Sequence, residues 1–341
     1  MNTYKKRQWL WQLPLLLVLI VGTVIIIRSQ RNTPYQHNEG FIFGTVYHIT
    51  YQYNSDLQQS IVGELQKVDE SLSMFNQHSL ISRINKGEAV QTDAMFDDVF
   101  ALAEKVSADT GGAFDITVAP LVNAWGFGFK SGAMPSNAKV DSIRQHVGYR
   151  KVSLRNHHVV KTDSLVMLDC SAIAKGYGCD VVAALLRSKG ISNFMIEIGG
   201  EVVTSGISEK RVPWKIGVTK PSDDPTQQNS EIQTVLNVTD KAMATSGNYR
   251  KFYYKNGRKY AHTIDPKTGR PVQHSLLSST VFAPDCATAD AYATAFMVMG
   301  VEQAKKVLDR HSDLAAYFIY SDGKGKNKVW FSPSLCNKII E

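Results

Sequence analysis

The sequence has few cysteines, and they follow no recognisable pattern. Only four occur among 341 residues. None forms a Cys-x-x-Cys pair and their spacing fits no disulfide framework, so the sequence indicates neither a metal or redox site of that kind nor a disulfide-stapled scaffold. Cys170 and Cys286 lie inside segments that carry other motifs. Disulfide pairing in an oxidising compartment stays open from sequence, but we expect buried free thiols.

The sequence also lacks long runs of basic residues, nucleic-acid-binding motifs, internal repeats and low-complexity tracts. Its 38 lysines and arginines against 31 acidic residues give a net charge of +7, but the basic residues are dispersed. We therefore expect no nucleic-acid partner. A phosphate-bearing ligand or an anionic membrane surface accounts for the charge more simply. With 43% hydrophobic residues, the chain can form one large domain or two ordinary ones.

One apolar run stands out, at residues 10–27. It is interrupted only by Gln12, Pro14, Gly22 and Thr23. About 18 such residues are enough to span a bilayer as a helix. The basic cluster at residues 5–7 predicts that the N-terminus is cytoplasmic.

The alternative for this run is a cleaved signal peptide. The run is long for one, no small-x-small cleavage site follows it, and no cysteine at its end is placed for lipoprotein processing. We therefore expect residues 1–31 to form a cytoplasmic basic stub and an uncleaved signal-anchor transmembrane helix in the cell inner membrane. Residues 32–341 would then form one extracytoplasmic domain that faces the periplasm.

The rest of the chain alternates between two hydrophobic periods. Residues 44–53 have a period of two, which predicts a strand, and residues 56–74 have apolar side chains at helical spacing. Further helices are expected at 93–109, 174–188, 288–299 and 301–311, and further strands at 165–168, 193–198, 214–219, 233–238, 259–264, 278–283 and 315–320. This mixture predicts an α+β fold with mixed, mainly antiparallel sheets and packed helices, preceded by the transmembrane helix.

The most informative stretch is D-C-S-A-I-A-K-G-Y at residues 169–177. A turn from a strand into a helix directs free backbone N–H groups and the positive end of the helix dipole at one spot. Lys175 would add a positive charge there and Asp169 an acceptor, which suits a phosphorylated ligand. The alternative is a helix start capped by Ser171, with Asp169 solvated and Lys175 on the surface. On this stretch alone both interpretations stay open.

The helix expected at 288–299 carries Asp290 and Thr294 one turn apart. That spacing places a carboxylate and a hydroxyl on one helix face. Such oxygen ligands suit Mg²⁺, which shares its shell with waters and ligand phosphates. The alternative is a surface aspartate and a threonine bonded back to a helix carbonyl. Because the neighbouring residues are apolar, an aspartate here needs a partner, which favours the metal.

Four other segments offer polar or aromatic groups. His262 ends a strand just before a turn and has the chemistry of a general base, although most of the nine histidines must have no such role. Trp125 lies among glycines and offers a plate for a flat ring, with core packing as the alternative. Glu197 and Glu201 flank paired glycines as weak candidates for polar contacts, and residues 245–250 form a small polar turn.

In this order, the segments resemble one family, the ApbE-type flavin transferases, which are FAD:protein FMN transferases. The resemblance covers about residues 40–299. The matching segments are S-L-S-M-F-N-Q-H-S-L-I-S-R-I-N at 71–85, G-G-A-F-D-I-T-V-A-P-L-V-N-A-W-G-F-G at 111–128, D-C-S-A-I-A-K-G-Y at 169–177, E-I-G-G-E at 197–201, A-T-S-G-N-Y-R at 244–250, H-T-I-D-P-K-T-G-R-P at 262–271 and C-A-T-A-D-A-Y-A-T at 286–294. So many long motifs in one order are far more specific than a single short motif.

The resemblance implies a metal site, a flavin site and a catalytic pair. The backbone carbonyl of Ala172 and the side chains of Asp290 and Thr294 would bind Mg²⁺, with Mn²⁺ as the alternative metal. The catalytic residues would be His262 and Lys175. The residues implied in FAD binding are Phe43, Ala124, Trp125, Gly126, Asp169, Lys175, Thr245, Ser246 and His262.

The chain departs from the family's usual pattern at three positions. Phe43 stands where the family often has Met, Asn248 where it often has Asp, and Cys170 where Leu is usual. Phe43 would change flavin packing, and Asn248 would remove a negative charge near the expected phosphate site. None of the three replaces a metal ligand or the base.

The activity that the resemblance implies is Mg²⁺-dependent transfer of the FMN part of FAD to a Thr or Ser hydroxyl of an acceptor protein, with release of AMP. The acceptors would be flavoprotein subunits of membrane redox complexes. The alternatives are an FAD pyrophosphatase, in which water replaces the acceptor hydroxyl, and a non-catalytic FAD-binding or electron-transfer flavoprotein.

Overall fold

The structure, a computed structural model, describes residues 13–24, 33–128, 134–221, 231–248, 252–255, 258–324 and 326–340. Residues 13–24 are helical, and their apolar side chains are exposed. No helix in these ranges is long and apolar enough to cross a membrane. The transmembrane helix predicted at 10–27 thus has no support from the structure. Positions 10–12 and 25–27 lie outside the described residues, and the anchor stays a prediction.

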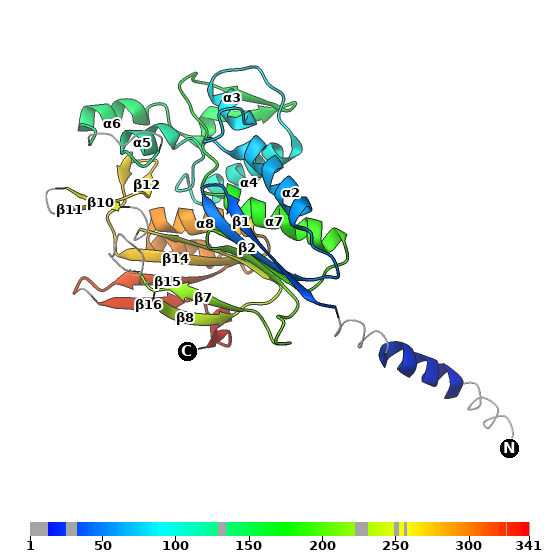
Figure 1. The fold of residues 1–341 in the computed structure, drawn as a ribbon. Helices are drawn as coiled ribbons and strands as arrows, with labels where there is room; N and C mark the ends of the chain where they lie inside the picture. Colours follow the sequence, from blue (N-terminus) through cyan, green and yellow to red (C-terminus); the bar gives the residue numbers. More distant parts are fainter. Residues whose placement is uncertain are drawn as a thin grey trace, which may run out of the picture.

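An antiparallel sheet of eight strands forms the centre of the described chain (Figure 1). Its strands, in spatial order, are β1 (Tyr35–Ile42), β2 (Thr45–Gln52), β5 (Phe194–Ile198), β6 (Glu201–Ser205), β9 (Lys241–Gly247), β14 (Leu276–Ala283), β15 (Ala315–Ser321) and β16 (Asn327–Phe331). Every neighbouring pair in this sheet is antiparallel, which confirms the predicted α+β class with mainly antiparallel pairing.

Five helices cover one face of this sheet: α2 (Gln58–Leu72), α4 (Ala94–Asp109), α7 (Ala174–Ser188), α8 (Cys286–Met299) and α9 (Val301–Leu308). The helix α8 lies innermost, packed on β9 and β14 and contacting α4 and α7. Its residues are apolar or small apart from threonines and Asp290, so the helix is buried on all sides.

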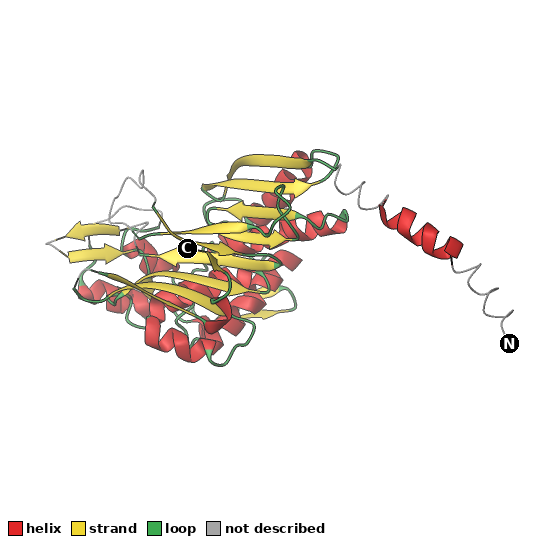
Figure 2. Ribbon diagram, turned by 90° about the horizontal axis from the view of Figure 1, so that it is seen from below, coloured by secondary structure: helices red, strands yellow, loops and turns green. Residues whose placement is uncertain are grey.

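A smaller sheet covers the other face of the central strands (Figure 2). It consists of β7 (Lys215–Thr219), β8 (Ile232–Asn237) and β17 (Ile339–Ile340), in the order β17-β8-β7. Because side chains alternate along a strand, Val281 of β14 faces the helices while its neighbour Phe282 packs against the smaller sheet. The central sheet is therefore buried on both faces in this region.

Shorter elements gather at one end of the molecule (Figure 1). They are α3 (Leu80–Asn85), α5 (Ala119–Ala124), α6 (Asn137–Arg144), the 3-10 turn Tyr149–Lys151, and the hairpins β3–β4 (Val152–Arg155 and His158–Lys161), β10–β11 (Phe252–Lys255 and Arg258–Ala261) and β12–β13 (Ile264–Asp265 and Arg270–Pro271). A second 3-10 turn, Pro333–Leu335, precedes β17. The elements α3, α5, α6 and β3–β4 were not predicted from the sequence, because each is too short to carry a clear period.

One predicted strand is absent and another is interrupted. Residues 165–168 form no strand, because the side-chain amide of Asn85 bonds to both backbone groups of Leu168, at 2.8 Å each, and so takes the place of a neighbouring strand. The strand predicted at 259–264 is broken, since β11 ends at Ala261 and β12 begins at Ile264. His262 and Thr263 lie in the break.

The four cysteines are reduced. Cys170, Cys179 and Cys286 are buried, as expected, and burial raises the pKa of all three thiols. Cys336 is exposed, which differs from the expectation.

Candidate active site

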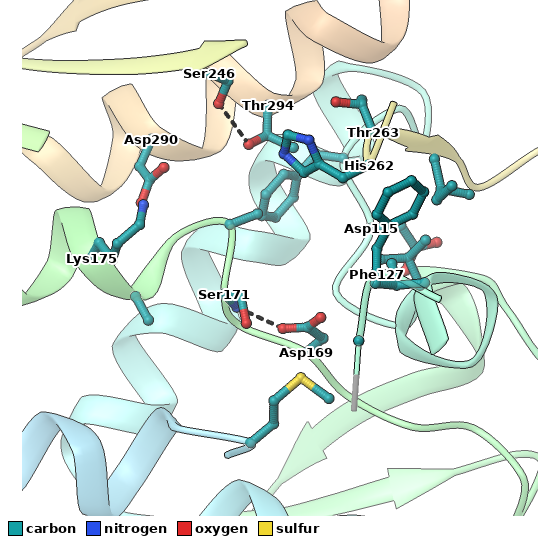
Figure 3. Close-up of a pocket in the computed structure, with 18 of the residues that line it drawn as sticks. Asp115, Phe127, Asp169, Ser171, Lys175, Ser246, His262, Thr263, Asp290 and Thr294 are labelled. Atoms are coloured by element: carbon teal, nitrogen blue, oxygen red, sulfur yellow. Dashed lines mark hydrogen bonds and ion pairs between the residues drawn. The ribbon is translucent and has the colours of Figure 1, made fainter. Parts of the chain in front are cut away.

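A cavity of about 380 Å³ opens beside one face of α8, among the ends of α2, α5, α7 and β9. Nine of the predicted site residues line it: Phe43, Asp169, Ala172, Lys175, Thr245, Ser246, His262, Asp290 and Thr294. Figure 3 shows Lys175, Ser246, His262, Asp290 and Thr294 converging from α7, α8, β9 and the segment before β12. The structure thus assembles groups that are far apart in the sequence.

The helix α8 supplies two oxygen donors to the cavity. Asp290 and Thr294, one turn apart, both line the cavity, as their spacing predicted. Asp290 is buried, and its Oδ2 accepts a hydrogen bond of 3.1 Å from the backbone N–H of Gly176. The Thr294 and Ser246 hydroxyl oxygens lie 3.1 Å apart. The alternative of a surface aspartate is therefore wrong.

The turn before α7 contradicts the alternative that the sequence left open, a helix start capped by Ser171. The helix begins at Ala174 after Ile173, without a side-chain cap, so Ser171 does not cap it. Instead the Asp169 carboxylate accepts a hydrogen bond of 2.8 Å from the backbone N–H of Ser171. Burial raises the pKa of Asp169, and the hydrogen bonds from Ser171 lower it by less than burial raises it. Ala172 lies in this turn and lines the cavity beside Asp169.

Lys175 is held by two buried carboxylates. Its Nζ lies 2.8 Å from Glu201 Oε1 and 3.8 Å from Asp290 Oδ2. Its side chain is only 28% exposed, so it does not lie on the surface. Sequence reasoning gave Glu201 little weight, yet Glu201 lines the cavity and stabilises the charge of Lys175. The signal was a glutamate that begins an apolar strand, the sequence E-V-V-T-S of β6.

His262 lies in the break between β11 and β12, with its ring edge-on to Phe127 at a centroid distance of 6.4 Å. The next residue, Thr263, donates a hydrogen bond of 2.6 Å from its hydroxyl to Asn248 Oδ1. The family's usual aspartate at position 248 would offer an acceptor of the same kind. The amide at Asn248 therefore keeps the hydrogen bond and removes only the charge.

Trp125 belongs to the core and does not line the cavity. Its indole N–H donates a hydrogen bond of 2.7 Å to the Gly269 carbonyl, and its ring stacks on Tyr260. Core packing, the alternative left open by the sequence, is therefore its observed role. Its neighbours Ala124 and Gly126 are also absent from the cavity lining, whereas Phe127, two residues further on, lines the cavity.

Asp115 is a further cavity residue that sequence reasoning missed. Its Oδ1 accepts hydrogen bonds from the backbone and hydroxyl of Thr117, and its Oδ2 accepts one from the Tyr149 backbone N–H at 2.8 Å. Burial raises the pKa of Asp115 against these bonds. The sequence D-I-T, with a hydroxyl two residues after an aspartate, was the available signal for this turn.

The donors at the cavity fit a hard divalent cation that shares its shell with a ligand. Within the described residues, no group of three His, Cys, Asp or Glu side chains is placed to hold a metal. Asp290, Thr294 and Ala172, whose carboxylate, hydroxyl and backbone carbonyl are the expected donors, nevertheless line one cavity. Mg²⁺ prefers such oxygens and commonly keeps positions for waters and substrate phosphates.

The fold and this cavity define an α+β protein with an oxygen-lined site beside a half-buried lysine. The model of the ApbE family matches residues 43–318, and the chain belongs to this family.

Curated relatives and solved structures are similar to this protein over most of its length. The FAD:protein FMN transferase of Escherichia coli (strain K12) is 33% identical over 297 residues, which cover 84% of this chain and 83% of the relative. The flavin transferase ApbE from Vibrio cholerae has a TM-score of 0.81 at 34% identity, covering 89% of this chain and 99% of that one. The apo form of the flavinyl transferase ApbE of Pseudomonas stutzeri has a TM-score of 0.79 at 28% identity, covering 89% of this chain and 96% of that one. The protein is thus a transferase enzyme.

Proposed function

We propose that this protein transfers the FMN part of FAD to a Thr or Ser hydroxyl of an acceptor protein and releases AMP. The observation that carries the proposal is the convergence of Lys175, His262, Asp290 and Thr294 on one cavity. Membership of the ApbE family supports the same activity. A site for this reaction must hold a pyrophosphate, neutralise its charge and accept one proton.

The reaction breaks the phosphoanhydride bond of FAD and forms a phosphoester bond to the acceptor. The acceptor hydroxyl oxygen forms a bond to the FMN-side phosphorus, and the bond from that phosphorus to the AMP oxygen breaks. The hydroxyl proton passes to His262, directly or through a neighbouring group. Because AMP is a competent leaving group once its charge is neutralised, positioning of the two reactants supplies most of the rate.

The chain's own residues hold the pyrophosphate and its counterion. Lys175, fixed in orientation by Glu201, directs positive charge into the cavity. Ala172, Asp290 and Thr294 would hold Mg²⁺, or Mn²⁺ as the alternative, and the metal when bound would neutralise charge on the pyrophosphate. Phe43, Asp169, Thr245 and Ser246 line the same cavity as the remaining FAD contacts.

We place the reaction at the cell inner membrane, with the catalytic domain of residues 32–341 facing the periplasm. The apolar run at 10–27 and the basic cluster at 5–7 support this orientation. The acceptors would be flavoprotein subunits of membrane redox complexes that carry a modifiable Thr or Ser.

The test uses the full chain in detergent, with FAD, Mg²⁺ and an extracytoplasmic threonine-bearing flavoprotein subunit from the same cell. We expect flavin fluorescence on the acceptor band in a denaturing gel, with one AMP released for each flavin attached. Free FMN and AMP without a labelled band would instead support the pyrophosphatase. Intact FAD throughout would leave only binding and would contradict the proposal.

The aromatic residues near the cavity give a separate prediction about flavin binding. We expect Phe127→Leu to weaken FAD binding by about 2- to 10-fold, because an aromatic contact contributes roughly 0.5–1.5 kcal/mol. Trp125→Phe should leave FAD affinity unchanged but lower the free energy of unfolding by about 1–3 kcal/mol, since the buried Gly269 carbonyl loses its donor. Quenching of flavin fluorescence without added metal measures the affinity, and urea unfolding measures stability. Equal losses of affinity in both variants would contradict the assignment of Phe127.

A further inference from the structure

Two neighbouring helices carry three of the polar groups in the cavity. Lys175 lies on α7, and Asp290 and Thr294 lie on α8. The helices touch backbone to backbone at Gly176, where an added Cβ would lie 2.3 Å from the Cys286 carbonyl oxygen and 2.9 Å from Ala287 Cα. A larger residue at Gly176 would therefore force the helices apart.

Asp180 joins these helices one turn further along α7. Its Oδ1 accepts a hydrogen bond of 2.8 Å from the Cys286 N–H, and its Oδ2 accepts one of 2.8 Å from the Ala287 N–H. These two donors belong to the first turn of α8, where backbone N–H groups have no partner within their own helix. One carboxylate thus fixes α8 from a neighbouring helix through both of its oxygens.

The ordinary cap of α8 is a different residue. Asp285 precedes the helix and its Oδ1 accepts a hydrogen bond of 2.8 Å from the Thr288 N–H. Asp285 therefore stabilises α8 alone, whereas Asp180 ties α8 to α7. Substitutions of Asp285 and Asp180 can therefore test helix capping and helix alignment independently.

A third contact links this alignment to the site. The Gly176 N–H donates to Asp290 Oδ2 at 3.1 Å, so the carboxylate orientation depends on how α7 and α8 are placed along each other. A shift by one residue moves a helix by about 1.5 Å along its axis. Such a shift would break this hydrogen bond and change the distance of 3.8 Å between Asp290 and Lys175.

We propose that Asp180 is a positioning residue, which holds α8 in register on α7 so that Asp290 and Thr294 face Ala172 across the cavity. The proposal rests on the proposed function in one respect, the role of Asp290 and Thr294 in holding a divalent cation. Asp180 does not line the cavity, so it acts only through the helix that it anchors.

The experiment compares Asp180→Asn with Asp285→Asn in the full chain. Mn²⁺ alone is the probe, and the electron paramagnetic resonance signal of the free ion gives its affinity without any turnover. We expect Asp180→Asn to bind Mn²⁺ at least about tenfold more weakly, the effect typical of residues that orient metal ligands. Asp285→Asn should stay within about twofold of the unmodified protein, because asparagine caps a helix about as well as aspartate.

A second variant, Gly176→Ala, disturbs the same helix contact with Asp180 intact and should also weaken Mn²⁺ binding. Equal Mn²⁺ affinities in Asp180→Asn and Asp285→Asn, or an unmodified protein that binds no Mn²⁺, would overturn the positioning role. FMN transfer by the unmodified protein is measured alongside. The unmodified protein could fail to transfer FMN while the variants still show the expected differences in Mn²⁺ affinity. That result would count against the proposed function and leave the role of Asp180 standing.

Discussion

An Asp290→Asn variant is expected to transfer FMN at least about a thousandfold more slowly than the unmodified enzyme. A bound metal contributes several kcal/mol to charge stabilisation in a transition state, and each tenfold in rate corresponds to about 1.4 kcal/mol. Asp290 is the only carboxylate among the three groups predicted to bind the metal. An amide of the same shape is a much weaker metal ligand, so the loss falls on the chemical step.

The substitution should leave the fold in place. The amide oxygen can still accept the hydrogen bond from the Gly176 N–H, and Lys175 keeps Glu201 at 2.8 Å. We therefore expect FAD binding without metal to change by less than about threefold, which is within the contribution of one neutral hydrogen bond. The rate of AMP release under single turnover, at saturating FAD and rising Mg²⁺, measures the effect.

Asp109→Asn is the matched control, because Asp109 contacts the opposite side of the same helix. Its Oδ2 accepts a hydrogen bond of 2.9 Å from the Tyr292 hydroxyl, and its Oδ1 pairs with Arg310 at 3.0 Å. The control should lose about 1–3 kcal/mol of stability while its transfer rate stays nearly unchanged. A similar loss of rate in both variants would mean that Asp290 acts by supporting α8 and not by contacting the reacting groups.

The sequence predicted those parts of the fold whose pattern is local and long. The helix α7 has the predicted bounds, and β14 and β15 differ from prediction only at their ends. The strand expected at 165–168 failed for a reason that no local pattern reveals. A side chain 83 positions earlier in the chain, Asn85, supplies the hydrogen bonds that a neighbouring strand would have supplied.

In the candidate site, too, the residues with a local pattern were predicted and those placed by distant contacts were missed. Spacing alone placed Asp290 and Thr294 on one helix face, and both line the cavity. Glu201 received little weight because its burial beside Lys175 depends on β6 lying between β5 and β9. Trp125 was preferred to Phe127 because nothing in the segment 123–128 tells which ring turns toward the core. Asp180 was missed because its partners are backbone groups of another helix.

His262→Gln is expected to lower the rate of FMN transfer by about 10²- to 10⁴-fold, the usual contribution of one general base. Glutamine keeps a polar side chain of similar reach at the break between β11 and β12, but it cannot accept a proton near neutral pH. The pH–rate profile of single-turnover transfer should therefore lose the limb that proton acceptance creates. FAD affinity should change little, because the edge-on contact with Phe127 is one of many around the cavity.

His274→Gln is the control, because it replaces a histidine that lies outside the cavity. His274 is held at 2.8 Å from the Met297 carbonyl at the far end of α8 and does not line the cavity. Its replacement should reduce stability and leave the pH–rate profile unchanged. If His262→Gln kept the full profile, another group would have to take the hydroxyl proton, and the function of His262 would be to shape the cavity. If instead the variant lost transfer but still hydrolysed FAD to FMN and AMP, His262 would govern the choice of acceptor, since water needs less help than a protein hydroxyl in reaching the phosphorus.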